Sequence, residues 1–396
     1  MSDERAALQA VVRHAVDLDG DYDGIAPSIT ALKSCGDPAL VPLLHEALDR
    51  FLDDGNFYGR DLIADILAGS QEMAALPVLL RASSRDLGDD QDSLSALIID
   101  LMDEDRAAAR VTVLEFAASH IPELRRTGLW ALGFVVESAD ADLLAAAVTD
   151  PDPRVRSLAV GSLQDPSENN RTFDVLVSAL HDRDEQVRVS AISRLDYTGR
   201  ADAVAPIAAL AADTAHRVRA WVAYALGRLG HPEAAPVLLR LRQDSDSHVR
   251  SNAIEAFGSI GGPVAVDALL TLADDDDPQL RARAAEALPK AVDSDPRVER
   301  QLAVLAGDGE AEVRAATIRG LARAAGRYPQ AVPLMVGLAG DPDPMVRQRV
   351  AVVVRRLAPD AAPDILRRYV DDPDQTVRRL AGTELARLTD PGAAGQ

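Results

Sequence analysis

Three aspartates near the N-terminus have the spacing that a calcium-binding loop requires. Asp19, Asp21 and Asp23 alternate along the chain and are followed by Gly24, which matches the first half of such a loop. The second half does not match, because its twelfth position is Thr30, where the loop needs a bidentate Glu. We therefore interpret this segment as an acidic connection between helices, and keep the three aspartates only as weak metal candidates.

The usual catalytic motifs are missing from the sequence. It contains no His-Glu-x-x-His zinc motif, no nucleophile elbow and no phosphate-binding loop. Cys35 is the single cysteine, which excludes an internal disulfide and a thiolate zinc cluster. We therefore expect a protein that is not an enzyme and needs no cofactor or metal.

The dominant pattern is a short stretch, first clear at Asp150-Pro-Asp-Pro-Arg-Val-Arg156, that returns every 31 to 33 residues. In each copy an apolar residue precedes an Arg. The apolar residue lies at positions 124, 155, 187, 218, 249, 280, 313, 346 and 377. A fixed period of this length is typical of a solenoid built from stacked repeats.

Each copy carries the signals of an amphipathic helix. Counting the apolar residue as position zero, positions zero, plus four and plus eight are apolar or small, as in Val155, Ala159 and Leu163. This spacing places one stripe on one helix face. Asp or Glu stands three residues before position zero in seven of the nine copies, which predicts an N-cap. A second, more apolar segment precedes each copy, so every repeat is expected to be a helix pair that stacks on its neighbours.

The repeats resemble the HEAT-repeat family, especially its short bacterial, phycobilisome-lyase-type form. The resemblance rests on the Asp-Pro-Asp turn, the Val-Arg pair and the ending Ala225-Leu226-Gly227-Arg228-Leu229-Gly230. It implies an all-α, right-handed solenoid of about eleven to twelve helix pairs, with the Val-Arg helices on the concave face. It also implies a ladder in which each Arg pairs with turn acids of neighbouring repeats. Arg219 is expected to depart from that ladder, because Ala215 replaces its turn acid.

Two kinds of enzyme are built on similar repeats, so an enzyme or lyase-like protein is the alternative. Deoxyhypusine hydroxylases hold iron with several His-Glu pairs, whereas this chain has one, His45-Glu46. Phycobilin lyases share the repeat type, but the repeat alone carries no lyase chemistry. The sequence therefore favours a non-catalytic scaffold.

The repeats divide the chain into regions of different regularity. We expect a capping helix at residues 1–20, degenerate acidic repeats at 21–120, regular repeats at 121–388 and a disordered tail at 389–396, all within one continuous solenoid.

Charge is concentrated at the front of the chain. Residues 1–150 hold 28 acids and 11 bases, which is most of the net charge of −21. This balance argues against binding of duplex DNA, which needs clustered basic residues. The N-terminus has no signal-peptide pattern, and no apolar run is long enough for a membrane span. We therefore expect a cytoplasmic, monomeric protein that does not bind membranes. Its acidic front either attracts a basic partner or only keeps the solenoid soluble.

The candidate binding residues lie beside the apolar stripe, at positions plus three and plus six of the Val-Arg helices. Both tryptophans of the protein fall in these rows, and aromatic and Arg side chains are typical anchors of protein interfaces. The candidates are Trp130, Trp221, Tyr224, Asn252, Glu255, Arg283 and Glu286. We expect them to bind a protein or peptide on the concave face, although each tryptophan could instead fill space between repeats. A narrower hypothesis is an immunity-type protein that neutralises a basic toxin.

Overall fold

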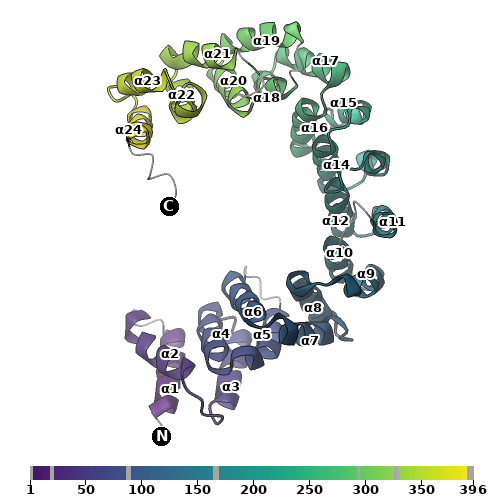
Figure 1. The fold of residues 1–396 in the computed structure, drawn as a ribbon, viewed down its shortest axis with the longest axis vertical. Helices are drawn as coiled ribbons and strands as arrows, with labels where there is room; N and C mark the ends of the chain where they lie inside the picture. The colour runs from purple at the N-terminus through teal and green to yellow at the C-terminus, as the bar shows by residue number, and fades with distance from the viewer. Residues whose placement is uncertain are drawn as a thin grey trace. The chain divides into compact units, whose positions relative to one another are not determined.

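The computed structural model describes residues 3–17, 22–85, 91–163, 169–291, 295–324, 328 and 330–389. These residues form α-helices and short 3-10 turns, and none of them lies in a strand, so the all-α prediction is confirmed (Figure 1). Contacts group the chain into two compact units, residues 1–165 and 166–396, and each is described by itself.

The first unit consists of five consecutive helix pairs. They are α1 (Asp3–Asp17) with α2 (Ala26–Lys33), α3 (Val41–Asp53) with α4 (Phe57–Gln71), α5 (Leu76–Ser83) with α6 (Asp92–Glu104), α7 (Arg106–Ala117) with α8 (Pro122–Val135), and α9 (Ala141–Ala147) with α10 (Pro153–Ser162).

The second unit adds seven pairs. They are α11 (Asn170–Ala179) with α12 (Glu185–Asp196), α13 (Val204–Ala209) with α14 (His216–Leu229), α15 (Ala235–Leu241) with α16 (Ser247–Ile260), α17 (Gly262–Ala273) with α18 (Pro278–Ala287), α19 (Pro296–Ala306) with α20 (Ala311–Arg323), α21 (Ala331–Gly337) with α22 (Pro344–Leu357), and α23 (Ala362–Tyr369) with α24 (Gln375–Thr389). The described residues thus form twelve pairs, in agreement with the predicted eleven to twelve.

The helices of each unit form two layers. Even-numbered helices, which carry the Val-Arg motif from α8 onward, pack directly against one another along the stack. Odd-numbered helices cover their outer side, and in the second unit the even-numbered helices lie on the inner side of the curve (Figure 1). Side chains on the exposed flank of the even-numbered helices therefore share one surface within that unit.

The predicted apolar stripe forms the core. Positions zero, plus four and plus eight are buried in most repeats, as for Val218, Val222 and Leu226, each with no exposed surface. Half-buried members are Leu124, Leu280 and Leu385. Burial of these side chains is what each helix gains from its neighbours, because a single amphipathic helix cannot cover its own apolar face.

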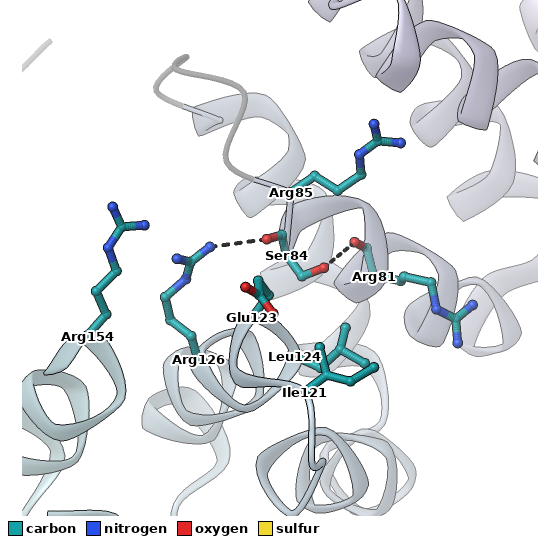
Figure 2. A pocket seen from close by; sticks show the side chains of 8 residues that line it. All are labelled: Arg81, Ser84, Arg85, Ile121, Glu123, Leu124, Arg126 and Arg154. Carbon is teal, nitrogen blue, oxygen red and sulfur yellow. Dashed lines mark hydrogen bonds between the residues drawn. The ribbon is translucent and has the colours of Figure 1, made fainter. Parts of the chain in front are cut away.

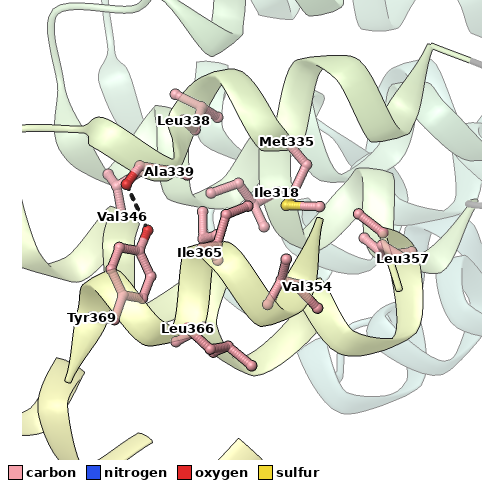
Figure 3. Packing of buried hydrophobic residues seen from close by; sticks show 14 of the residues in the cluster. Ile318, Met335, Leu338, Ala339, Val346, Val354, Leu357, Ile365, Leu366 and Tyr369 are labelled. Carbon is pink, nitrogen blue, oxygen red and sulfur yellow. Dashed lines mark hydrogen bonds between the residues drawn. The ribbon is translucent and has the colours of Figure 1, made fainter. Parts of the chain in front are cut away.

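The last repeats show how this core is filled (Figure 3). Val346 and Val354 of α22 pack with Met335 of α21 and Ile365 of α23, and all four are buried. The buried Tyr369 hydroxyl donates a hydrogen bond of 2.8 Å to the carbonyl oxygen of Ala339. The one polar atom that enters this cluster is therefore satisfied, as buried polar atoms in proteins usually are.

Glycine allows the closest helix contacts. A Cβ added to Gly128, at position plus four of α8, would collide with the backbone of Ala117 in α7. A Cβ at Gly227 would lie 2.8 Å from the Cβ of Ala256 in α16. Small residues at these points therefore set how tightly neighbouring helices stack.

Most of the predicted N-caps are present. The carboxylates of six aspartates accept hydrogen bonds from the first backbone N–H groups of their helices. They are Asp152, Asp184, Asp246, Asp277, Asp343 and Asp374. Glu310 occupies the same position before α20 but makes no side-chain cap. The prediction was wrong for this residue, because the extra methylene of Glu places its carboxylate less well for capping than that of Asp.

The arginine ladder exists, but its acids are not the capping ones. Arg219 donates bidentate hydrogen bonds of 2.6 and 2.8 Å to the carboxylate of Asp244, two residues before the N-cap of the next repeat. It also donates to the carbonyl oxygen of Asp213 in its own repeat, at 2.8 Å. The same bidentate pairing links Arg125 to Asp150, Arg188 to Asp213, Arg281 to Asp308, Arg314 to Asp341 and Arg347 to Asp372.

The predicted exception in this ladder is therefore wrong. Ala215 replaces a capping acid, which leaves the Arg219 pairing intact. Arg250 is an exception instead. Among the described residues it donates only to the backbone carbonyl oxygens of Asp244 and Ser245, both at 2.8 Å, and not to the equivalent acid, Asp275. One rung of the ladder is thus missing between α16 and α18.

One stretch of the described residues, 57–83, passes a length and hydropathy test for a membrane span. It is not one helix, because Glu72 has a φ of 49° and separates α4 from a 3-10 turn that leads into α5. Half of its most apolar window is buried within the unit. We interpret it as core helices of the stack.

Candidate functional site

The seven predicted binding residues are divided between the two units. Trp130 belongs to α8 of the first unit, whereas the other six belong to α14, α16 and α18 of the second unit. Within the second unit they form two groups, one aromatic and one charged.

The aromatic group lies on α14 and the end of α12. The rings of Trp221 and Tyr224 meet edge to face, with centroids 5.4 Å apart. The Arg228 guanidinium lies over the ring of Tyr197 at 4.6 Å and near that of Tyr224 at 6.0 Å. Tyr197 is 65% exposed and Tyr224 is 44% exposed. We call Tyr197, Trp221, Tyr224 and Arg228 the aromatic–arginine cluster.

A buried carboxylate lies beside this cluster. The Asp196 side chain is 1% exposed, and its Oδ1 is 3.6 Å from Nε of Arg228. Among the described residues that oxygen accepts no hydrogen bond. Burial raises the pKa of Asp196 to about 6, against the opposing attraction of Arg228. The carboxylate helps to hold Arg228 over the tyrosine rings, at a cost in stability when it is ionised.

We expect Asp196→Asn to stabilise the protein at pH 8 and to change little at pH 4. A group whose pKa is raised by folding contributes stability that is present at low pH and is lost as pH rises through its folded value, here about 6. The gain at pH 8 should be on the order of 1–3 kcal/mol. Denaturant unfolding at the two pH values measures it. A variant that is less stable at pH 8 would show that the attraction of Arg228 outweighs the burial.

The charged group lies on α16 and α18. Glu255 pairs with Lys290 at 3.1 Å, and Glu286 pairs with Arg319 of α20 and with Arg323 at 3.4 Å. Glu255, Arg283 and Glu286 line one small pocket of about 60 Å³. The three predicted residues therefore do lie together, and two of them, Glu255 and Glu286, take part in ion pairs.

Asn252 has a structural role. Its Nδ2 donates a hydrogen bond of 3.0 Å to the carbonyl oxygen of Ala220 in α14. The side chain therefore links two neighbouring inner helices.

Sequence reasoning missed Tyr197, Arg228 and Phe134. Phe134 is 37% exposed and meets the Trp130 ring edge to face, with centroids 5.3 Å apart. All three residues lie at position plus ten of their repeats. Positions plus three, plus six and plus ten follow one another on one helix face. Extending the two rows by one turn could therefore have found them.

The candidate calcium loop remains untested. Asp19 and Asp21 lie outside the described residues, and Asp23 lies in a 3-10 turn, Tyr22–Gly24. In the described part of the chain, no group of three His, Cys, Asp or Glu side chains is arranged to hold a metal ion.

Solved structures with the same architecture include those of Kap95p and importin beta. Kap95p, in a complex with RanGDP, is 17% identical with a TM-score of 0.59, and the match covers 100% of this chain and 62% of Kap95p. Importin beta is 15% identical with a TM-score of 0.53, over 93% of this chain and 59% of importin beta. This chain thus spans about three fifths of the length of each. Identities this low show the fold alone.

Enzymes with related repeats match less well. The CpcE–CpcF phycocyanin lyase of Nostoc sp. is 21% identical, covers 57% of this chain and 92% of its own, and has a TM-score of 0.36. A TM-score this low carries no argument about activity.

The sequence itself identifies the family. No curated protein matches the chain significantly. The sequence pattern of HEAT repeats matches residues 173–246, 218–289 and 298–386, which together cover just over half of the chain. With twelve stacked helix pairs and an arginine ladder, the chain belongs to the HEAT-repeat family.

Proposed function

We propose that this HEAT-repeat chain is a non-catalytic scaffold that binds a protein partner on the inner surface of its second unit, with the aromatic–arginine cluster as the anchor. The observation that carries the proposal is the exposure of Tyr197 and Tyr224, at 65% and 44%, beside Trp221 and Arg228. Large aromatic rings that are exposed to water on a helix surface are unfavourable in free energy. A partner that covers them removes this cost.

The composition of the cluster fits a protein interface. Trp, Tyr and Arg are the side chains that contribute most to binding when a partner buries them. The ring edges and the guanidinium are fixed by their mutual contacts, so little side-chain entropy remains to be lost on binding. Kap95p, which shares the fold, is described in a complex with RanGDP. That likeness supports protein binding as a use of this architecture.

The charged group on α16 and α18 extends the proposed interface. The pairs Glu255–Lys290 and Glu286–Arg323 are partly exposed and lie next along the stack. Exposed pairs contribute little to stability, so they are available to exchange partners with charges on a bound protein. In this proposal the ion pairs orient the partner, and the aromatic–arginine cluster provides most of the affinity.

A narrower form of the proposal concerns the partner's charge. The 28 acids and 11 bases of residues 1–150 would speed association with a basic protein, by an amount that salt would reduce. An immunity-type inhibitor of a basic toxin, acting as a monomer in the cytoplasm, is the form of this proposal that the charge favours.

We expect Trp221→Ala with Tyr224→Ala to weaken partner binding by at least tenfold without unfolding the array. The partner is first recovered by cross-linking to the full chain in a host lysate, then expressed and titrated by calorimetry. Removal of two buried aromatic contacts costs about 2–4 kcal/mol at a hot spot. Circular dichroism checks that the helices persist.

The matched control is a pair of exposed apolar residues on outer helices. Val264 of α17 and Val304 of α19 are 50% and 60% exposed. Val264→Ala with Val304→Ala should leave affinity unchanged. If this control pair abolishes binding while the aromatic pair does not, the inner surface is not the interface.

A further inference from the structure

Five of the six repeats from α14 to α24 carry a basic residue at position plus ten. Four of these residues have a carboxylate at ion-pair distance. The pairs are Arg228 with Asp196, Lys290 with Glu255, Arg323 with Glu286, and Arg387 with Glu384. The fifth, Arg356 of α22, has no ion pair within the described residues. The row of paired bases is thus interrupted at α22.

A change of sign at position plus six explains this interruption. The carboxylates that pair with Lys290 and Arg323 both come from position plus six of the preceding repeat. The equivalent residue before Arg356 is Arg319, which is a base. Arg356 instead donates a hydrogen bond of 3.1 Å to the carbonyl oxygen of Ala322. This bond positions the guanidinium group and leaves its charge without an ion-pair partner.

α22 carries a second arginine of this kind. Arg349 is exposed and makes neither an ion pair nor a hydrogen bond within the described residues. It precedes Arg356 by seven residues, so both side chains lie on one helix face. Met345 and Val352, which are 41% and 50% exposed, share that face. We call Met345, Arg349, Val352 and Arg356 the α22 strip.

The surroundings of the α22 strip supply little negative charge. α22 contains four arginines and no acid. Its other two arginines are paired, since Arg347 forms the ladder pair with Asp372 and Arg355 pairs at 2.8 Å with Glu384. The strip therefore presents two cations and two apolar side chains to solvent, in a chain whose net charge is −21.

Arginines alone do not mark a binding surface in this chain. A pocket of about 630 Å³ in the first unit is lined by four of them, namely Arg81, Arg85, Arg126 and Arg154 (Figure 2). Their side chains point away from one another, Arg85 pairs with Asp53 at 2.9 Å, and Glu123 shares the lining. The α22 strip differs, because its arginines share one helix face with exposed apolar side chains.

We propose that the α22 strip docks an acidic amphipathic helix of a partner protein. A helix rises about 1.5 Å per residue, so Arg349 and Arg356 are separated by about 10 Å along the axis. Two acids seven residues apart on a partner helix have the same separation and also share one face. Apolar residues between those acids would cover Met345 and Val352, as when an amphipathic helix docks on a helical surface.

This surface is separate from those already proposed. It lies four repeats along the stack from α14, which carries most of the aromatic–arginine cluster, and does not depend on that cluster. It also lies in the other unit from the acidic residues 1–150, which would attract basic surfaces. The α22 strip thus adds an acidic docking segment to the partners that the chain can hold.

A nucleic acid fits the strip less well than an acidic helix. Phosphates could meet Arg349 and Arg356, but Met345 and Val352 offer them no hydrogen-bond donor. Glu312, 51% exposed, lies on α20, which packs against α22, and would repel a continuous phosphate backbone. A partner helix can place its acids only where the two arginines lie.

The test titrates the full chain with a stapled helical peptide and follows fluorescence anisotropy. The peptide has about eighteen residues, because short unconstrained helices are marginal in water. Leu occupies every seventh position, and Glu follows each Leu by four residues. We expect this Glu peptide to bind at least tenfold more tightly than the same peptide with Gln, and salt to reduce the difference. Equal binding of the two peptides would overturn the proposal.

Variants locate the bound peptide. Arg349→Gln with Arg356→Gln should weaken binding of the Glu peptide at least tenfold. The charge-matched control, Arg367→Gln with Arg368→Gln on the outer helix α23, should not change it. Trp221→Ala with Tyr224→Ala should not change it either, which separates this site from the aromatic–arginine cluster. Equal weakening in either control would show that the peptide binds elsewhere, and the proposal would be wrong.

A charge exchange keeps the test independent of lost folding. Arg349→Glu with Arg356→Glu should lose the Glu peptide and gain binding of the same peptide with Lys at the acidic positions. Circular dichroism checks that the helices persist. A folded variant that does not prefer the Lys peptide contradicts the proposal.

Other occupants of the strip would give different results. An eight-nucleotide RNA that binds more tightly than the Glu peptide would indicate a nucleic-acid site. Self-association of the full chain in sedimentation, abolished by Arg349→Gln with Arg356→Gln, would indicate a contact between copies. Asp390 lies outside the described residues, and peptide binding only after Asp390→Asn would indicate the chain's own C-terminal segment. Each of these three results overturns the assignment to a partner's acidic helix.

Discussion

Leu226→Ala is expected to lower the free energy of unfolding by about 2–5 kcal/mol, because it deletes a fully buried side chain and leaves a cavity. Leu226 has no exposed surface and occupies position plus eight of α14, in the middle of the second unit. Helices on both sides in the stack border it, so the cavity cannot be closed by a single helix moving inward. Denaturant unfolding followed by circular dichroism measures the loss.

The same substitution at the end of the stack is the matched control. Leu385 occupies the equivalent position in α24 but is only half-buried. Leu385→Ala should therefore cost clearly less than Leu226→Ala, since less apolar surface is removed from the core. Equal losses of unfolding free energy at the two positions would contradict this prediction. They would show that the cost of the substitution does not depend on how deeply position plus eight is buried.

Asp244→Asn is expected to cost about 2–4 kcal/mol, because it leaves the Arg219 guanidinium without the carboxylate that pairs with it across two repeats. The Arg219 and Asp244 side chains are 15% and 10% exposed, so water compensates little for the lost pair. Asn keeps an oxygen that can accept the backbone N–H of Asp246, which the carboxylate now accepts at 2.9 Å. The substitution therefore removes the ion pair and leaves the turn intact.

Asp275→Asn provides the control for this measurement. Asp275 accepts the equivalent backbone N–H, from Asp277 at 2.9 Å, but makes no ion pair with Arg250. Its loss should be below about 1 kcal/mol, as for a turn acid without a buried charge partner. If both substitutions cost the same, the bidentate pair contributes nothing beyond the turn.

The ion pair also predicts an acid dependence. The hydrogen bonds from Arg219 lower the pKa of Asp244 below its usual value. A lowered pKa contributes stability that is present above the unfolded value of about 4 and is lost as pH falls through the folded value. The difference between Asp244→Asn and the unmodified chain should therefore shrink below pH 4.

The sequence alone determined the repeat architecture. The spacing of Val218, Val222 and Leu226 predicted one buried face, and all three are buried. The aspartates before the Val-Arg helices predicted N-caps, and six of them cap. These features could be predicted because they depend on contacts within one helix, or on a spacing of apolar residues that recurs in every repeat.

Tertiary structure decided which acid each ladder arginine meets and which residues share a surface. The partner of Arg219 is Asp244, 25 residues away, and not a capping acid; Arg250 makes no equivalent pair. Tyr197 and Arg228 come from two different repeats. Such contacts depend on the offset and rotation between stacked helices, which side-chain packing sets and the repeat period does not encode. The period thus specified the helix pairs, while packing between them specified the candidate sites.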